Sequence, residues 1–314
     1  MLIFWIFVFV VSLVVLVKGA DWLIASAEKI GLSLGLSPFI VGVTIVGIGT
    51  SFPELISSFF AVIEGATDVP VANAVGSNIA NIFLIVGISA VIGKKLVVTK
   101  NLIDLDIPLL AASTALFLGT AYDGVITRGE SVLLLAAFAG YFIYTLLDKE
   151  EFAGSESLLE PEVRKKVVLK DFILLIVGIV ALIFGAKYLV ESLVNLSIIL
   201  NIATGVIAIT AVAIGTSLPE LLVSLKALLQ KKSEVALGNI FGSNVFNILV
   251  VVGIPGLFQT LTIDPQSFSI GLPALIVATL LFTISGISKK IHLWEGLFFL
   301  FLYVLFIGKL FAWF

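Results

Sequence analysis

Two glutamates lie in the middle of long apolar stretches of this sequence, and each directly follows a proline. Glu54 belongs to the stretch GIGTSFPELISS and Glu220 to the stretch AIGTSLPELLVS. A carboxylate at the depth of a lipid bilayer costs at least about 2.5 kcal/mol, and a proline inside a helix costs roughly 3 kcal/mol. A purely structural element has no need to incur both costs twice. The two glutamates are therefore candidates for chemistry, and the groups around them indicate which chemistry.

Hydroxyl and amide side chains surround each glutamate at helical spacing. Thr50 lies four residues before Glu54 and therefore on the same helix face, with Ser51 beside it. Ser77 and Asn81 are also four residues apart, on the next apolar stretch. The second copy repeats the set. The candidate ion-binding side chains are Thr50, Ser51, Glu54, Ser77, Asn81, Thr216, Ser217, Glu220, Ser243 and Asn247.

All of these groups are hard oxygen donors. Ca²⁺ takes about six to eight oxygen ligands in a flexible geometry, and two glutamates neutralise one Ca²⁺; the same oxygens could hold Na⁺. The motifs contain no imidazole or sulfur donor, which argues against zinc, copper or nickel sites. The alternative for any single hydroxyl is a hydrogen bond to the carbonyl four residues earlier in its own helix. The GSN segments could likewise be contacts between small residues of neighbouring helices.

The backbone before each glutamate is expected to be bent or broken. Pro53 cannot donate a hydrogen bond to the carbonyl of Gly49, and its ring displaces that carbonyl. Gly47 and Gly49 loosen the same turn. The carbonyls that a break would leave free are tolerated at membrane depth only where protein or an aqueous cavity satisfies them, and a bound cation would do so.

The composition is that of a helical integral membrane protein. Of the 314 residues, 60% are hydrophobic and only 12% charged, whereas a soluble domain is nearer half apolar and a quarter charged. The apolar runs are continuous and do not alternate, which favours helices over a barrel. The absence of cysteine excludes disulfides and a thiol nucleophile. His292 is the only histidine, which argues against a histidine-based metal site, and no P-loop motif for ATP occurs.

Ten apolar runs of about 20 residues predict an all-α protein with ten transmembrane helices. They lie near 2–17, 37–63, 70–92, 103–119, 130–147, 171–190, 204–229, 235–258, 270–286 and 293–313. The longest polar stretch, 148–170, separates five runs from five. We therefore expect a first five-helix repeat over 1–147, a cytoplasmic linker, and a second repeat over 171–314.

The two halves are copies of each other at an offset of 166 residues. The offset aligns the two glutamate motifs, and it also aligns NAVGSNIANI (73–82) with NIFGSNVFNI (239–248) and GADWL (19–23) with GAKYL (185–189). Five helices per copy is an odd number, so the second copy enters the membrane from the opposite side. Inverted repeats of this kind, with a site at the midplane and broken helices around it, are the architecture of many secondary transporters.

The distribution of lysine and arginine predicts the orientation. With the N-terminus outside, all but three of the 18 basic residues fall on the inner side, and the exceptions are Arg128, Lys187 and Lys309. Both termini are then extracellular and the 148–170 linker is cytoplasmic. The charged residues at the inner end of the first run are expected to extend toward the membrane surface. They are Lys18, Asp21, Glu28 and Lys29.

The doubled motifs resemble the α-repeats of the cation/Ca²⁺ exchanger superfamily. The likeness is closest to the Na⁺/Ca²⁺ exchangers of the short archaeal and bacterial type. It is carried by GTSFPELISS with GSNIAN in the first half, and by GTSLPELLVS with GSNVFN in the second. The ten-span inverted layout extends the resemblance over the whole chain.

The resemblance implies a Na⁺/Ca²⁺ antiporter of a prokaryotic cell membrane, with the ten side chains above as midplane ligands. It adds the backbone carbonyls of Gly47 and Ala213 as Na⁺ ligands, and it implies alternating access in which the first and sixth spans slide against the rest. No cofactor, ATP or nucleic acid is implied, and a monomer is expected to suffice. K⁺-dependent relatives carry Asp where this chain has Asn247, so the amides at Asn81 and Asn247 argue against K⁺ dependence.

Other functions stay open at this point. A Ca²⁺/H⁺ antiporter of the same superfamily would carry protons on the two glutamates, although those relatives resemble a G-N-x-x-E pattern rather than G-T-S-x-P-E. A cation channel is a remote alternative, because TIVGIG (44–49) faintly resembles a K⁺ filter. The second copy lacks that pattern, and two inverted copies cannot build a fourfold pore. An enzyme is not expected, since no nucleophile–base pair is present.

Overall fold

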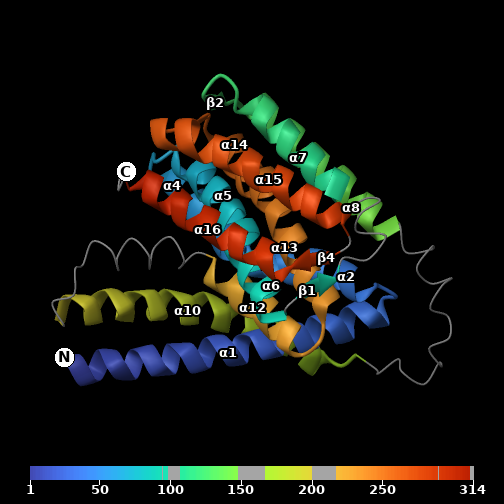
Figure 1. The fold of residues 1–314 in the computed structure, drawn as a ribbon, viewed down its shortest axis with the longest axis vertical. Helices are drawn as coiled ribbons and strands as arrows, with labels where there is room; N and C mark the ends of the chain where they lie inside the picture. Colours follow the sequence, from blue (N-terminus) through green and yellow to red (C-terminus); the bar gives the residue numbers. More distant parts are fainter. Residues whose placement is uncertain (94, 98–106, 148–166, 200–216, 289, 312–314) are drawn as a thin grey trace.

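The computed structural model describes residues 1–93, 95–97, 107–147, 167–199, 217–288 and 290–311. These residues are almost entirely helical (Figure 1). The first half contains α1 (Leu2–Ser33), α2 (Pro38–Val41), η1 (Gly42–Val46), α3 (Gly47–Thr50), α4 (Phe52–Ile63), α5 (Val69–Ile79), η2 (Ala80–Val86), α6 (Gly87–Gly93), α7 (Ile107–Thr120) and α8 (Arg128–Leu147). The second contains α10 (Leu169–Ile199), α12 (Leu218–Leu229), α13 (Ser233–Phe246), η5 (Asn247–Val251), α14 (Gly253–Phe258), η6 (Ser267–Gly271), α15 (Leu272–Ile287) and α16 (Leu293–Leu310). The η elements are short stretches of π-helix.

Every predicted span contains a helix. By length and composition, seven described helices could cross a membrane: Leu2–Ser33, Pro38–Ile63, Val69–Gly93, Leu169–Leu196, Ser233–Phe258, Ser267–Ile287 and Leu293–Leu310. Ile107–Thr120 is a shorter apolar helix, and α8 has 20 residues. α12 lies in the seventh predicted span, whose first part falls among residues 200–216, outside the described ranges. The 148–170 linker lies largely outside them as well.

Two pairs of short strands connect the halves, which the all-α prediction did not include. β1 (Lys95–Val97) pairs antiparallel with β4 (Lys290–His292), and β2 (Val125–Ile126) pairs antiparallel with β3 (Leu261–Thr262). The offset of 166 residues converts one pair into the other, because the partners Lys95 and His292 correspond to Leu261 and Ile126. The two pairs lie at different ends of the helices in Figure 1. They therefore show the inverted repeat in the backbone itself.

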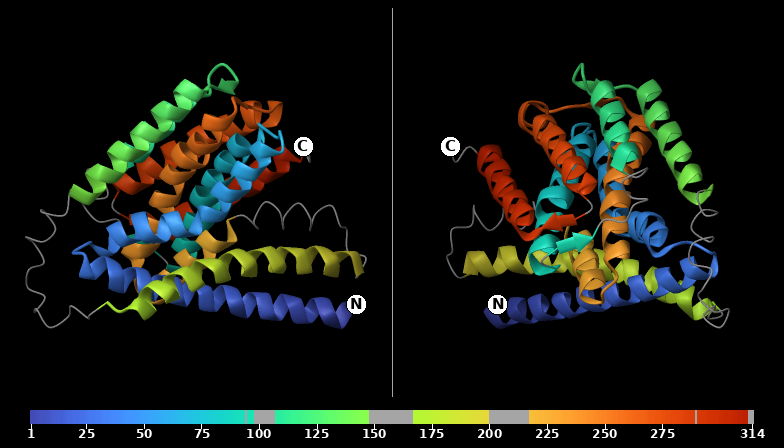
Figure 2. Two further views of the ribbon diagram at one scale, coloured as in Figure 1. Left: turned by 180° about the vertical axis from the view of Figure 1, so that it is seen from behind. Right: turned by 45° about the vertical axis from the view of Figure 1, so that its right-hand side comes forward.

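α1 and α10 form a pair that lies side by side along one edge of the molecule (Figures 1 and 2). The repeated GA motifs account for their close contact. A Cβ atom added at Gly19 would lie 3.0 Å from the carbonyl oxygen of Gly178, and one added at Gly185 would lie 2.7 Å from Leu16. Small residues thus allow two long helices to pack closely where lipid supplies no hydrophobic drive.

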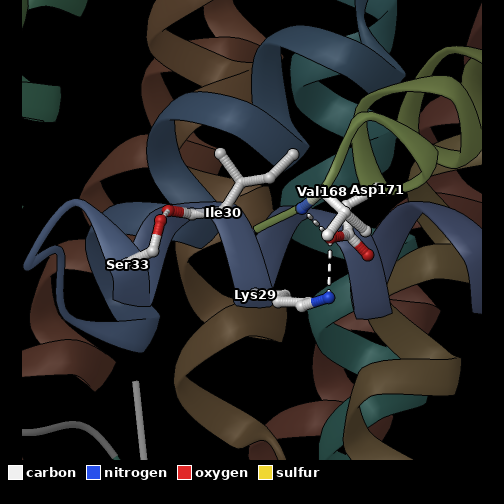
Figure 3. A network of polar contacts seen from close by, with 5 residues as sticks. All are labelled: Lys29, Ile30, Ser33, Val168 and Asp171. Atoms are coloured by element: carbon white, nitrogen blue, oxygen red, sulfur yellow. Dashed lines mark hydrogen bonds and ion pairs between the residues drawn. The ribbon is translucent and has the colours of Figure 1, made fainter. Parts of the chain in front are cut away.

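The α1 helix is much longer than its predicted span, and Asp21, Glu28 and Lys29 near its end form ion pairs with residues of the second repeat. Lys29 Nζ lies 2.6 Å from Asp171 Oδ2 at the start of α10, and that oxygen also accepts the backbone N–H of Val168 at 2.8 Å (Figure 3). Asp21 pairs with Lys226 of α12 at 3.1 Å. Periodicity alone could not reveal these partners, which come from distant parts of the chain.

A third ion pair joins α1 to the second half. Glu28 Oε2 lies 2.5 Å from Nζ of Lys232, just before α13.

The buried apolar side chains form two clusters. The larger one surrounds α5, η2, α13, η5 and α15, and the smaller one lies between the α1–α10 pair and the helices α2 and α12. The α1–α10 pair is therefore attached through its own apolar layer and through charges at one end.

The two repeats meet where α13 crosses α2 and η1. A Cβ atom at Gly42 would lie 2.6 Å from the carbonyl of Val235, and a Cβ atom at Gly238 would lie 2.3 Å from the carbonyl of Phe39. No side chain fits between these backbones. The glycines bring the Gly47–Thr50 segment of one repeat against the polar face of α13 in the other, and this contact builds the site.

Candidate cation site

A non-helical serine precedes the glutamate-bearing helix in both repeats. α3 ends at Thr50, α4 begins at Phe52, and Ser51 between them has φ −88° and ψ 4°. The equivalent Ser217 precedes α12 with φ −90° and ψ 7°. The predicted break is thus confirmed before Glu54, whereas the residues before Ser217 lie outside the described ranges. Glu54 and Glu220 each lie in the first turn of the helix that follows, where the helix dipole favours negative charge.

The amides of the second motif lie at irregular turns as well. Asn81 belongs to the π-helical turn η2, and its equivalent Asn247 begins the π-helical turn η5. Such turns inside helices are frequent at functional sites because they redirect side chains and backbone groups. The irregularity recurs at the same position of the repeat, so it is a property of the motif.

Side chains from the two repeats interleave at the breaks. Ser51 Oγ of the first repeat donates to Glu220 Oε1 of the second at 3.0 Å. Thr50 Oγ1 lies 3.3 Å from Ser243 Oγ. Both contacts join residues that are far apart in the sequence, and they bring the two halves of the predicted ligand set into one place.

The carbonyl of Gly47, which the resemblance implies as a Na⁺ ligand, already accepts a hydrogen bond from the backbone. It accepts the backbone N–H of Ser51 at 3.1 Å and lies 3.3 Å from the hydroxyl of Ser243. The break falls one turn later than this carbonyl, so the last hydrogen bond of α3 still uses it. Two further predicted groups, the carbonyl of Ala213 and the side chain of Thr216, lie outside the described residues.

The site contains buried polar atoms that have no hydrogen-bond partner among the described residues. Glu54 and Glu220 are each only 1% exposed. Burial of an unpaired charged or polar group is costly, and native structures satisfy nearly all such groups. The unpartnered atoms are both carboxylate oxygens of Glu54, Oε2 of Glu220, the hydroxyls of Ser77 and Ser217, and the amide oxygen and nitrogen of Asn81 and of Asn247.

These atoms have the chemistry of a cation site. Carboxylate, hydroxyl and amide oxygens are the ligands that Ca²⁺ and Na⁺ accept, whereas softer metals prefer nitrogen or sulfur. Within the described ranges, no three His, Cys, Asp or Glu side chains gather in a metal-binding group. A cation here would therefore depend on hydroxyl and amide oxygens in addition to two carboxylates.

Two asparagines lie against the helices that contain the glutamates, and the residue-type argument from the sequence overlooked them. Asn239 Nδ2 lies 2.9 Å from Ser224 Oγ and 3.3 Å from the backbone carbonyl of Glu220. The equivalent Asn73 Nδ2 lies 3.0 Å from Ser58 Oγ. All four residues belong to the duplicated motifs and obey the 166-residue offset, which is the signal that could have identified them.

Comparison with known proteins places these motifs in a family. The family model for sodium/calcium exchanger proteins matches residues 4–147 and 170–312. The sodium/calcium exchanger MaX1 of Methanosarcina acetivorans is 33% identical to this chain, and the alignment covers 97% of each protein. The uncharacterized membrane protein MJ0091 of Methanocaldococcus jannaschii is also 33% identical, over 96% of each.

A solved structure has the same fold over nearly the full length. The sodium-calcium exchanger NCX_Mj, soaked with zero Na⁺ and Ca²⁺, superposes with a TM-score of 0.83 at 31% identity. The match covers 99% of this chain and 100% of the other. The ten-helix arrangement of two inverted five-helix repeats is therefore the fold of this chain.

Proposed function

Because this chain belongs to the family of sodium/calcium exchanger proteins, we propose that it is a secondary-active antiporter that moves Ca²⁺ out of a prokaryotic cell in exchange for Na⁺. The observation that carries the proposal is the set of buried oxygen atoms without partners around Glu54 and Glu220. Two carboxylates balance the charge of one Ca²⁺. Na⁺ would use overlapping oxygens, so the two ions compete for one cavity and exchange.

We assign the ions to the repeated oxygen donors. The side-chain ligands are those of Thr50, Ser51, Glu54, Ser77, Asn81, Thr216, Ser217, Glu220, Ser243 and Asn247, and the backbone carbonyls of Gly47 and Ala213 serve Na⁺. The contact of Ser51 with Glu220 supports a site shared by both repeats. Since one chain supplies both halves of the set, a monomer would be sufficient for transport.

The α1–α10 pair is the element that we expect to move. It packs against α2 and α12 through an apolar layer that is separate from the larger core cluster. Sliding of this pair across α4 and α12 would open the site to one side of the membrane at a time. The site helices themselves could stay fixed, because the ligands come from helices outside the pair. No covalent step, cofactor or nucleotide is required.

We expect both termini to lie outside the cell, because lysine and arginine are in excess in the loops on the opposite, cytoplasmic side. In this cysteine-free chain the orientation is tested by single cysteines. A cysteine at Ser155 should react with a membrane-impermeant thiol reagent only from the cytoplasmic side, and one at Thr67 only from outside. The reverse pattern would show that the orientation is inverted, so that the side of the site assigned here to the cytoplasm faces the outside.

The function is tested by uptake of radioactive Ca²⁺ into vesicles that contain the purified protein and are loaded with Na⁺. Uptake should require the outward Na⁺ gradient and should saturate with Ca²⁺. A pH gradient that drives uptake without Na⁺ would instead show a Ca²⁺/H⁺ antiporter. Large unitary currents without coupling to a counter-ion would show a channel.

A further inference from the structure

We propose that Asn239 is a positioning residue for the cation site, because its side-chain oxygen accepts the proton of the Thr50 hydroxyl and so leaves lone pairs of Thr50 for the ion. The inference rests on the proposed cation site and adds a residue that does not itself touch the ion. Asn239 is completely buried. It belongs to α13, in the repeat opposite to that of Thr50.

The orientation of the Asn239 amide follows from its neighbours. One end of the amide lies 3.3 Å from the backbone carbonyl of Glu220 and 2.9 Å from Ser224 Oγ. A carbonyl can only accept a hydrogen bond, so this end must be the NH₂ group. The other end, which lies 3.0 Å from Thr50 Oγ1, is therefore the oxygen.

The direction of the Thr50 hydrogen bond follows in turn. An amide oxygen has no proton to donate, so Thr50 must be the donor in this contact. A hydroxyl has one proton and two lone pairs, and the ligand of a cation must present a lone pair. Asn239 thus removes the one orientation of the hydroxyl, with its proton toward the site, that would repel a cation.

Two other groups near Thr50 compete less well for its proton. The carbonyl of Gly47 lies at 3.2 Å and already accepts the backbone N–H of Ser51. The hydroxyl of Ser243 lies at 3.3 Å and can donate its own proton to the same carbonyl. The contact with Asn239 is the shortest of the three.

Asn239 also links the two repeats mechanically. Its NH₂ group holds the start of the half-helix that contains Glu220, and its oxygen holds a proposed ligand of the other repeat. The equivalent Asn73 makes the same contacts in its own repeat, with the carbonyl of Glu54 at 3.2 Å and with Ser58. Its expected counterpart for the oxygen is Thr216, outside the described residues, so the proposal is made for Asn239.

The test is a double-mutant cycle with Thr50→Val, Asn239→Leu and the two combined. Leucine approximately fills the volume of asparagine but accepts no hydrogen bond. The apparent Ca²⁺ affinity is measured in vesicles from Na⁺-driven uptake, and in detergent from the rise in melting temperature on addition of Ca²⁺. Each single change should weaken Ca²⁺ binding about tenfold, the size expected for the loss of one good hydrogen bond. The combined variant should be no weaker than the single ones, because Asn239 acts through Thr50.

The matched control is Ser224→Ala, which removes an acceptor of the Asn239 NH₂ group and leaves the contact with Thr50. Its Ca²⁺ affinity should change by less than about twofold, within the range of a weak neutral contact. The proposal is overturned if the two losses multiply, if Ser224→Ala is as damaging as Asn239→Leu, or if Asn239→Leu lowers the melting temperature without changing the affinity. If Asn239→Leu does not fold, Asn239→Ala takes its place in the cycle. Absence of both uptake and Ca²⁺-dependent stabilisation in the unmutated protein would instead refute the proposed function.

Discussion

Asn78 Nδ2 donates a hydrogen bond of 2.9 Å to the backbone carbonyl of Asn244, the residue that occupies the same position in the other repeat. The two helices α5 and α13 therefore touch at equivalent residues, as expected close to the axis that relates the repeats. The side chain of Asn244 does not donate the equivalent hydrogen bond to the backbone of Asn78. Asn244 Nδ2 donates instead to the carbonyl of Ile240 in its own helix at 2.7 Å. Both side chains are buried, so a difference in solvent exposure does not account for the asymmetry.

This asymmetry predicts unequal effects of two equivalent substitutions. Asn78→Ala removes a bond between repeats, whereas Asn244→Ala removes one within a single helix. Asn78→Ala should therefore lower the stability more, by about 1 kcal/mol, which is typical of one buried hydrogen bond. Thermal unfolding of the two variants in the same detergent measures the difference. Equal losses of stability would show that the bond between the repeats contributes no more than the bond within α13.

Glu54→Gln and Glu220→Gln should each nearly abolish Ca²⁺ transport and leave a folded protein. Each substitution removes half of the negative charge that balances Ca²⁺ in a buried site, and a neutral amide replaces it poorly. Transport is measured as Na⁺-driven Ca²⁺ uptake, and folding as gel-filtration behaviour and melting temperature. The control is Glu64→Gln, because Glu64 is exposed at the end of α4. Uptake at the level of the unmutated protein in either site variant would contradict the assignment.

The ion pairs at the end of α1 should bias the direction from which the site is accessible. Asp21 and Glu28 pair with Lys226 and Lys232, whereas the residues equivalent to these lysines are Phe60 and Ala66. Among the described residues, charges therefore hold the α1–α10 pair against the helices of the site at one end only. Under the proposed orientation this end is cytoplasmic.

Neutralisation of both acids, Asp21→Asn with Glu28→Gln, should raise the population that is open to the cytoplasm. The apparent Ca²⁺ affinity measured from the cytoplasmic side should then rise, and the affinity from outside should fall, because each depends on the fraction of protein in the competent state. Vesicles of known orientation allow both measurements. Lys187→Gln, at the position equivalent to Asp21, is the control and should shift neither. A loss of affinity on both sides would indicate damage to the site.

Transport should be independent of K⁺, and Asn247 should be part of the reason. Two glutamates balance one Ca²⁺, so a K⁺ carried with it would leave an excess positive charge in a medium of low dielectric. Asn247 is buried and both atoms of its amide lack a partner among the described residues, which suits a side chain that faces an ion. Asn247→Asp should change the apparent affinity for Ca²⁺ or Na⁺ and add a pH dependence from the new carboxyl group.

A structural role for Asn247 makes a different prediction. The Asn247→Asp variant would then lose stability while the ion affinities of the surviving protein stayed the same. Uptake by the unmutated protein is measured with external K⁺ varied at constant ionic strength. A strict requirement for K⁺ would show that the charge at position 247 does not determine whether transport depends on K⁺.

The sequence by itself determined the membrane class, the ten spans, the duplication and the residue types of the site. It could do so because these depend on local properties: continuous apolar runs, the odd number of runs per copy, and a proline that cannot complete a helical hydrogen bond before Glu54 and Glu220. The break at Ser51 and the start of α12 directly after Ser217 follow from the same local chemistry. They are therefore the features in which prediction and structure agree most closely.

Only the tertiary structure decided which residues of one repeat meet those of the other. The contact of Ser51 with Glu220, the hydrogen bond of Thr50 to Asn239 and the pairing of Lys29 with Asp171 all join residues more than 140 positions apart. No periodicity within a helix specifies such partners, because they depend on how closely two helices approach and at what register. Glycines such as Gly238, where no Cβ fits, set that approach. The sequence contains these glycines, but the backbone that each one contacts exists only in the folded chain.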